Sequence, residues 1–278
     1  MLLELAPGLR IVRRGRAHLQ IGLHDPRRVV LPHSRATTYV LDRLVERRPL
    51  DLDLFGVAAV AARLIDSGCA IRADGADSPQ TPGSSRGGLG VAVLEDAGEP
   101  DRLDVGAALR AAGLTVVSRL EDCDVVLAAV VGELERDRLD GLLRRRTPHL
   151  LVRLVDGVVV LGPFVVPGQT ACLRCLDAHA AEADPDHLPV LSRYVVASRA
   201  PRPDGRADLV APAIAQLALA WAARDLLAHA DGQRPSTWST TVRLGPRPGD
   251  EARHVWERHP ECGCCWQGDA RSSGRMEE

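Results

Sequence analysis

The sequence predicts an α/β protein of two domains, and three observations lead to this prediction. Short β-type runs open the 278-residue chain, and two helical stretches follow them. A stretch rich in Gly, Ser, Pro and Asp then holds almost nothing that a core could bury, as expected of a linker. After it, apolar runs alternate with helical stretches, which indicates a mainly parallel sheet. The predicted parts are an N-terminal domain at 1–74, a linker at 75–88, an α/β domain at 89–266 and a disordered tail at 267–278.

The N-terminal domain is expected to consist of three strands, two helices and a closing strand. Arg-Gly and His-Asp-Pro turn signals separate the first strands, and Ser34 can cap the first helix. Strands followed by helices and a last strand are typical of a winged-helix-like unit. The predicted strands lie at 9–15, 17–23, 27–32 and 69–74, and the predicted helices lie at 34–47 and 51–68.

The second domain is expected to have a Rossmann-like arrangement. Its apolar runs read as buried strands, and helical stretches separate several of them. Asp208 can cap the longest helix, and Pro212 falls in its first turn, where proline is tolerated. The predicted strands lie at 89–95, 114–120, 124–131, 148–155, 158–168 and 236–245, the helices at 104–113, 133–146 and 208–232, and a proline-interrupted segment at 182–208.

Composition argues against several function classes. The formal net charge is −2, so no basic field over the whole chain favours nucleic acid or an anionic membrane. The chain contains no lysine, because all 35 residues counted as Lys or Arg are Arg. A phosphate-binding or Schiff-base lysine is therefore excluded. No apolar run approaches the roughly 18–20 residues of a membrane helix, and too few apolar residues precede Pro7 for a signal peptide. We therefore expect a cytoplasmic protein with reduced thiols.

Two cysteine pairs far apart in the chain are the strongest sign of a site. Cys172 and Cys175 have C-x-x-C spacing, which lets two thiolates reach one ion from a tight turn. In the second pair, Cys262 with Cys265 has the same spacing, and Cys262 with Cys264 is one residue tighter. Spacing favours Cys265, with Cys264 as the alternative. Four thiolates predict a structural Zn²⁺, while a redox pair and unpaired thiols are the competing interpretations.

The sequence argues against a nucleotide site. The glycines of RGGLG (86–90) precede the first strand of the second domain, whereas a phosphate-binding loop must follow that strand and open a helix. The segment that does follow the strand, 95–104, holds five carboxylates and one arginine. These carboxylates would repel a pyrophosphate. We therefore expect no nucleotide cofactor and no catalytic residue in this chain.

The run LVDGVVVLGPFVVPGQTACLRCLDAH (154–179) resembles the ThiF-like, ubiquitin-activating type of adenylating fold, in which cysteine pairs hold a structural zinc. Together with HPECGC (259–264), and over residues 5–266, the chain more closely resembles the cyclodehydratase-domain, precursor leader peptide-binding proteins of azoline-peptide (TOMM) biosynthesis. The resemblance implies a winged-helix peptide-recognition domain ahead of a ThiF-like domain. It also implies a non-adenylating scaffold that binds the leader of a ribosomally made peptide and presents it to a YcaO-type cyclodehydratase, the partner that consumes ATP.

Leader binding would use strand addition, in which an extended peptide pairs with a sheet edge and places its side chains beside a helix. Arginines of the helix at 34–47 could serve an acidic leader, although such charges more often form a solvated face. An ATP-dependent adenylating enzyme and a winged-helix transcription regulator are the alternative functions, and a homodimer is compatible with the sequence. The expected peptide groove involves Arg28, Val29, Val30, Leu31, Tyr39 and Arg43.

Overall fold

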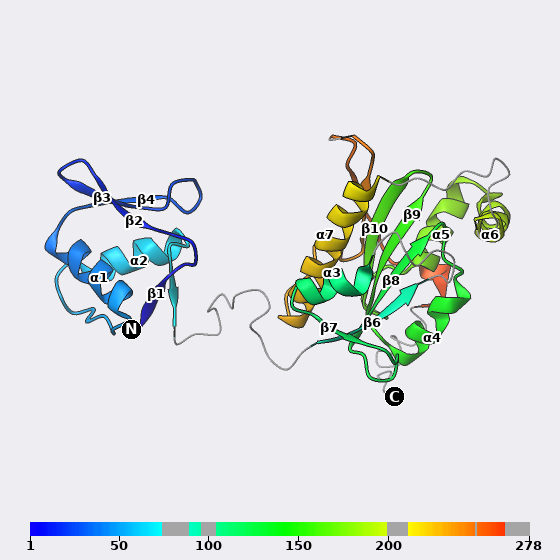
Figure 1. Ribbon diagram of the computed structural model, residues 1–278, viewed down its shortest axis with the longest axis horizontal. Coiled ribbons are helices and arrows are strands. Elements are labelled where there is room, and N and C mark those ends of the chain that lie inside the picture. The colour runs from blue at the N-terminus through cyan, green and yellow to red at the C-terminus, as the bar shows by residue number, and fades with distance from the viewer. Residues whose placement is uncertain (74–88, 96–103, 199–210, 248, 265–278) are drawn as a thin grey trace, which may run out of the picture. The chain divides into compact units, whose positions relative to one another are not determined.

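The computed structural model describes residues 1–73, 89–95, 104–198, 211–247 and 249–264 (Figure 1). The predicted linker, the predicted tail and most of the acidic segment at 95–104 lie outside the described residues. The chain divides into two compact units, residues 1–81 and 82–278, and each is treated by itself below. No helix among the described residues is both long enough and apolar enough to cross a membrane.

The N-terminal unit combines two small antiparallel sheets with two helices. A three-stranded meander has the order β2-β3-β4, and a two-stranded sheet pairs β1 with β5. The Ser34 side chain accepts a hydrogen bond from the Thr37 backbone N–H and so caps α1, as predicted. One apolar cluster joins both sheets to both helices. The bounds are β1 (Leu3–Leu5), β2 (Ile11–Arg14), β3 (His18–Ile21), β4 (Val29–Pro32), α1 (Arg35–Glu46), α2 (Val57–Asp66) and β5 (Ala70–Arg72).

Two details of this unit differ from the prediction. The strand β1 was not expected, because three residues give too short a run for a period-2 pattern to stand out. The second helix begins at Val57 rather than at residue 51. Between α1 and α2, the Asp51 side chain accepts a hydrogen bond from the Asp53 backbone N–H at 3.1 Å, so this residue forms a turn that competes with helix.

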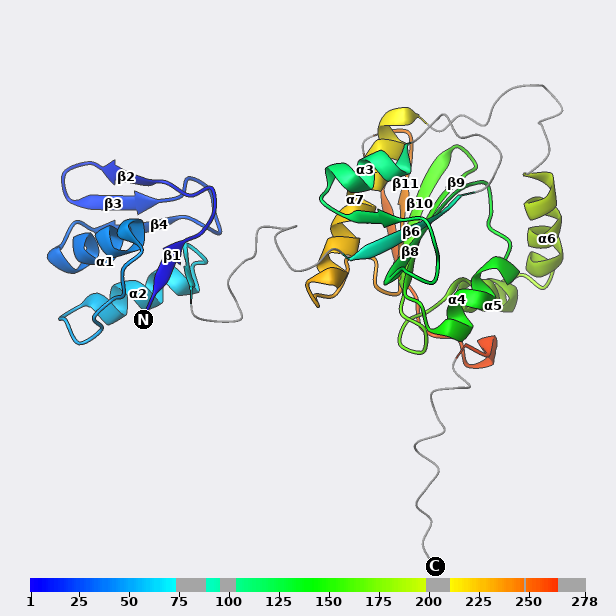
Figure 2. The same cartoon turned by 60° about the horizontal axis from the view of Figure 1, so that its bottom comes forward.

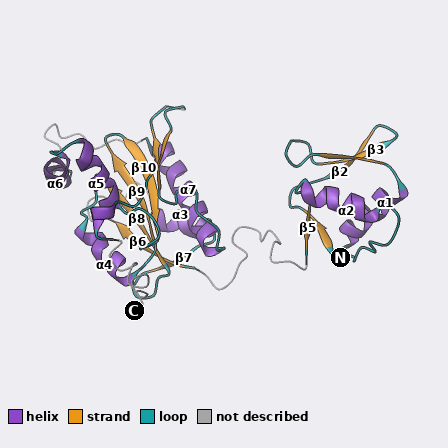
Figure 3. Ribbon diagram, turned by 180° about the vertical axis from the view of Figure 1, so that it is seen from behind, coloured by secondary structure: helices purple, strands orange, loops and turns teal. Residues whose placement is uncertain are grey.

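The second unit is built on a seven-stranded mixed sheet of order β12-β11-β10-β9-β8-β6-β7. The pairs that join β7, β6, β8 and β9 are parallel, and the pairs that join β9 to β12 are antiparallel (Figure 3). The α/β fold class was therefore predicted correctly. The strands are β6 (Gly90–Glu95), β7 (Thr115–Val117), β8 (Val125–Val131), β9 (His149–Val155), β10 (Val158–Val165), β11 (Thr240–Leu244) and β12 (Ala252–Val255).

Helices cover both faces of this sheet and make three layers (Figure 2). One buried cluster joins the sheet to α3 (Val105–Ala111) and α7 (Pro212–Ala230). A second cluster, on the opposite face, joins it to α4 (Asp137–Arg145) and α5 (Leu173–Ala183). The described part of the proline-interrupted segment contains the helix α6 (His187–Ala197), which packs against α5.

The end of β10 leads into the first cysteine pair. Gly162 has a φ of +90°, and a side chain there would collide with the carbonyl oxygen of Thr240 on β11. The glycine thus allows β10 and β11 to approach closely, at the place where the register of β10 against β9 shifts between Leu161 and Phe164. A turn then follows in which Thr170 Oγ1 accepts the Val166 backbone N–H at 2.7 Å. This turn brings Cys172 to the start of α5.

Candidate functional site

Four cysteine sulfurs lie together on the α4–α5 face of the sheet. Sγ of Cys172 is 3.8 Å from that of Cys175 and 3.5 Å from that of Cys262. Sγ of Cys175 is 3.5 Å from that of Cys264, and all four sulfurs lie within 4.8 Å of one another. A tetrahedral zinc with four Zn–S bonds of about 2.3 Å places its sulfurs about 3.8 Å apart. The separations therefore fit a tetrahedral ion, and they are far longer than a disulfide of about 2.05 Å.

Each pair reaches the cluster on its own element. Cys172 immediately precedes α5 and Cys175 lies in its first turn, where backbone N–H groups and the helix dipole favour thiolates. Cys262 ends the short 3₁₀ helix η1 (Pro260–Cys262), and Gly263 follows with a φ of +75°. This left-handed turn lets Cys264 point back to the sulfurs. The C-x-x-C pair is buried, while the C-terminal pair is half-buried.

The four thiols cannot all ionise without a cation. The pKa of Cys175 is lowered because the Cys172 thiol donates a hydrogen bond to it. The pKa of Cys262 is also lowered, again chiefly by a hydrogen bond with Cys172. The pKa values of Cys172 and Cys264 are raised, since these sulfurs share protons with their ionised neighbours. A divalent ion would replace these protons, so metal binding should release protons and weaken in acid.

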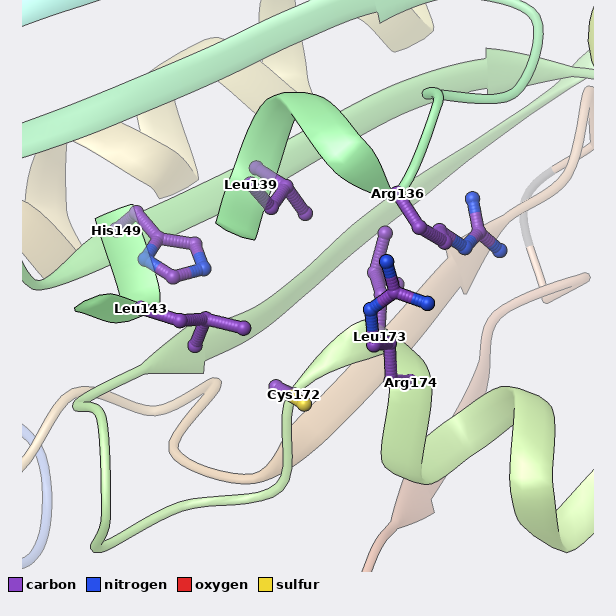
Figure 4. A pocket seen from close by; sticks show the side chains of 7 residues that line it. All are labelled: Arg136, Leu139, Leu143, His149, Cys172, Leu173 and Arg174. Carbon is purple, nitrogen blue, oxygen red and sulfur yellow. The ribbon is translucent and has the colours of Figure 1, made fainter. Parts of the chain in front are cut away.

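The cluster has the character of a structural centre. Four thiolates fill a tetrahedral ion and leave no position for a reacting water. The cavity beside the cluster has a volume of about 10 Å³ and lies against α4 and the start of α5 (Figure 4). That space admits one water molecule at most, so no substrate group could enter it. Its lining consists of Arg136, Leu139, Leu143, His149, Cys172, Leu173 and Arg174.

A second polar cluster lies where a Rossmann-like sheet would bind a ligand. The strand order reverses between β6 and β8, and ligands bind beyond the carboxyl ends of strands at such a switch point. Directly after β8, Glu133 binds Arg136 at 2.8 Å and Arg153 at 2.6 Å. Arg136 also binds Asp177 of α5 through two bonds of 2.7 and 2.8 Å. These side chains are between 8% and 12% exposed, so their charges compensate one another in a nearly buried position.

This charged network was missed by sequence reasoning. Burial alone would lower the pKa of Arg136, but Asp177 and Glu133 raise it above its ordinary value. Burial lowers the pKa of Arg153, although the charge of Glu133 opposes that shift. Both arginines are paired with carboxylates inside the protein and are not directed to an external phosphate. The sequence did hold a signal: the charged run ELER (133–136) directly follows a buried strand, at the edge where parallel strands end.

The free edge of β4 is the second candidate binding feature. Among the described strands, β4 pairs with β3 and has no neighbour on its other side. The His33 N–H donates to the Ala17 carbonyl at 2.7 Å, and hydrogen-bonded pairs alternate along an antiparallel ladder. The pair Gln20–Val30 is therefore one that does not exchange hydrogen bonds. Its geometry directs the backbone N–H and C=O of Val30 away from β3, toward the open edge.

The residues of the predicted peptide groove differ in how far they are exposed to solvent, and therefore in what they could offer a peptide. Val29 and Leu31 are 6% and 1% exposed and belong to the core, and their backbone groups pair with β3, so neither residue offers a free group to a peptide. Val30 is half-buried and Arg28 is exposed. On α1, the Arg43 guanidinium lies 5.2 Å from the Tyr39 ring centroid. The Tyr39 hydroxyl accepts the Asp51 N–H at 3.3 Å.

Of the predicted metal ligands, the structure describes all but Cys265. The structure brings together Cys172, Cys175, Cys262 and Cys264, which was the alternative fourth ligand. Cys265, which spacing favoured, lies outside the described residues. The one-residue spacing of Cys262 and Cys264 suffices because Gly263 reverses the chain between them.

Comparison with known proteins places the fold. No protein-family model matches the sequence, and no curated protein sequence matches it. The heterocyclase TruD matches with a TM-score of 0.68 and 18% identity, over 95% of this chain and 42% of TruD. A heterocyclase in complex with substrate and cofactor matches with a TM-score of 0.64 and 17% identity, over 95% of this chain and 39% of the heterocyclase. MccB from E. coli matches with a TM-score of 0.59 and 14% identity, over 100% of this chain and 99% of MccB.

These matches establish a shared fold. They extend over both units of this chain, since they cover at least 95% of it. The chain spans about two fifths of each heterocyclase chain, whereas it spans nearly all of MccB. MccB has also been solved with ATP and with MccA.

Proposed function

We propose that this chain is a non-adenylating scaffold that binds the leader of a ribosomally made precursor peptide. It would present that peptide to a separate YcaO-type cyclodehydratase for azoline formation. In this proposal residues 1–74 are a winged-helix-like recognition domain, and residues 89–266 are a ThiF-like domain with a four-cysteine zinc centre. The observation that carries the proposal is the fold shared with heterocyclase chains of which this chain spans about two fifths.

The open edge of β4 supports peptide capture. A bound leader would accept the Val30 N–H and donate to the Val30 C=O, and so extend the three-stranded sheet. Its side chains would meet the half-buried side chain of Val30 and the aromatic and cationic pair of Tyr39 and Arg43. Main-chain pairing gives affinity for an extended peptide, and the side-chain contacts select its sequence.

The charge distribution supports an acidic leader. Residues 1–73 hold twelve arginines and seven carboxylates, a net charge of +5. The whole chain has 35 basic and 37 acidic residues. Residues 74–278 therefore hold 23 basic and 30 acidic residues, a net charge of −7. The N-terminal unit would therefore attract an acidic segment while the second unit repels it.

The charged network that follows β8 supports a scaffold rather than an adenylating enzyme. Arg136 and Arg153 are engaged with Glu133 and Asp177 in this chain. An ATP phosphate that bound these arginines would have to displace three short ion pairs that are almost excluded from water, which costs more than displacing exposed pairs would. Adenylation is the alternative function, because MccB has a similar fold and has been solved with ATP.

Binding measurements on the purified full chain test the proposal. Fluorescence anisotropy with labelled N-terminal segments of precursor peptides from its native host should give saturable binding that weakens with salt. An acidic peptide of scrambled sequence is the control, since it keeps the charge and loses the strand register. Isothermal titration with ATP should give no heat, and ATP–pyrophosphate exchange should stay at background. Exchange activity, or tighter binding to duplex DNA than to every peptide, would contradict the proposal.

A further inference from the structure

A group of three side chains lies beside the cysteine cluster and is used by nothing described above. His179 and Glu182 lie on α5, and His259 is the residue before η1. Nitrogen and oxygen atoms of the three lie within 4.8 Å of one another. His259 Nε2 is 3.0 Å from Glu182 Oε1, and His179 Nδ1 is 3.6 Å from Glu182 Oε2. We call these three residues the histidine cluster.

The hydrogen bonds of His259 argue against a second metal ion in the histidine cluster. The Glu261 backbone N–H donates to His259 Nδ1 at 3.1 Å, so this nitrogen acts as an acceptor. A neutral imidazole that accepts at Nδ1 carries its proton on Nε2. Nε2 therefore donates to Glu182 and has no lone pair for an ion. Each ring nitrogen of His259 is thus occupied by one hydrogen bond, so neither nitrogen is left to bind a metal ion.

We propose that His259 is a positioning residue that holds the C-terminal cysteine pair against α5 before a metal ion binds. This inference rests on the metal-binding part of the proposed function. One ring nitrogen of His259 caps η1, the helix that ends at Cys262, and the other joins that helix to Glu182 on α5, the helix that begins beside Cys172. His259 as a whole is 3% exposed, and its ring lies edge-on to that of His179, with centroids 4.8 Å apart.

Further hydrogen bonds hold the same segment without any sulfur. The backbone N–H of Trp256 donates to the Ser239 carbonyl at 2.7 Å, and its indole N–H donates to Thr241 at 2.9 Å. His179 donates to the Glu257 carbonyl at 3.1 Å, and Arg258 donates to the Gly168 carbonyl at 2.8 Å. Gly168 belongs to the turn before Cys172. The two cysteine pairs are therefore brought into register by contacts that need no ion, which lowers the ordering cost of metal binding.

Zinc affinity, measured by chelator competition, tests the role of His259. Glu182→Ala removes the acceptor, and His259→Asn keeps an acceptor for the Glu261 N–H but is too short to reach Glu182. Each should weaken zinc binding by about tenfold, the effect of losing one good hydrogen bond. Glu182→Gln keeps an acceptor oxygen and should restore most of the affinity. Glu257→Ala is the matched control, because it removes an exposed carboxylate of the same segment and leaves its carbonyl in place.

Amide exchange on the zinc-free, reduced protein gives a second measurement that needs no metal. Protection of the Trp256, Glu261 and Cys262 amides is expected in the wild type and should fall in Glu182→Ala and His259→Asn. Exchange in the zinc-free wild type at the rate of an unstructured peptide would overturn the inference. Zinc affinities of Glu182→Ala and His259→Asn within twofold of the wild type would overturn it as well. If the wild type bound no zinc while these amides stayed protected, the metal site would fail and the positioning contacts would stand.

Discussion

Cys172 and Cys175 serve the core of the second unit as well as the candidate ion. They are 2% and 0% exposed and belong to the apolar cluster that joins the sheet to α4 and α5. A bound ion would cross-link this core to the C-terminal segment, which contributes only half-buried cysteines. Because structural zinc can contribute on the order of 10 kcal/mol of apparent folding free energy, losing one ligand should affect stability as well as metal content.

The identity of the fourth ligand gives a residue-scale prediction. Cys264→Ser should abolish stoichiometric zinc and lower the melting temperature, as Cys172→Ser should, because a serine hydroxyl is a poor substitute for a thiolate. Cys265→Ser should keep its zinc, since Cys264 already completes the set of four sulfurs. Elemental analysis and thermal unfolding measure both effects, with Cys123→Ser as a control outside the cluster. Loss of zinc in Cys265→Ser alone would identify Cys265 as the ligand.

The buried side chain of His149, which lines the cavity beside the cysteine cluster, makes the stability of the protein depend on pH. Burial lowers its pKa to about 4, although its Nδ1 bonds the Thr147 carbonyl. An unfolded chain has a histidine pKa of about 6.5 and therefore binds more protons between these pH values. The contribution of the neutral, buried His149 to the free energy of unfolding is present in full above about pH 6.5. It is lost as the pH falls toward 4, by up to about 3 kcal/mol.

A comparison of two variants by urea unfolding at pH 7 and pH 4.5 tests this prediction. His149→Gln keeps a donor for the Thr147 carbonyl and cannot be protonated, so its free energy of unfolding should fall less than that of the wild type between the two pH values. His254→Gln alters an exposed histidine of the same unit and should behave like the wild type. Equal acid losses in His149→Gln and the wild type would contradict the prediction.

At the scale of elements, the open edge of β4 makes a prediction about peptide capture. Val30→Pro removes the outward N–H, so the affinity for the leader should fall by at least about tenfold. Arg13→Pro is the matched control on the other outer strand, because the pair Arg13–Leu19 also directs its backbone away from β3. Anisotropy titrations should give near-wild-type binding for Arg13→Pro, with Arg13→Ala correcting for the charge. A larger loss of leader affinity in Arg13→Pro than in Val30→Pro would place the peptide-binding edge on β2.

The elements that the sequence predicted well are those with a long, regular pattern. The strands from β6 to β11 and the helices α3, α4 and α7 were expected near their observed positions, because all of them except β7 bury an apolar run or one helical face. The helix α6 was missed since Pro189 interrupts its pattern, yet proline is tolerated in a first turn. The network of Glu133, Arg136 and Asp177 was missed for another reason. Its members lie up to 44 residues apart in the chain, and only the fold brings them together.

For the whole molecule, the two units carry opposite charge and separate candidate functions. Each has its own apolar core, one in the N-terminal unit and two in the second, so the features of one unit do not depend on burial supplied by the other. The candidate peptide edge lies wholly in the first unit and the cysteine cluster wholly in the second. The proposal therefore predicts that peptide binding and metal binding can be separated by truncation.

A chain of residues 82–278 should fold, bind one zinc ion and fail to capture the leader peptide. Zinc should stay because all four sulfurs and the histidine cluster are retained. Peptide binding should disappear because β4, α1 and the net charge of +3 that residues 1–81 carry are removed together, leaving a unit of negative charge that repels an acidic leader. Elemental analysis and anisotropy on the truncated and full-length proteins measure the two properties, with full-length Val30→Pro as the control that loses the edge and keeps the charge. Leader capture by the truncated protein would place the peptide site on the second unit, and loss of zinc would make the metal centre depend on the first.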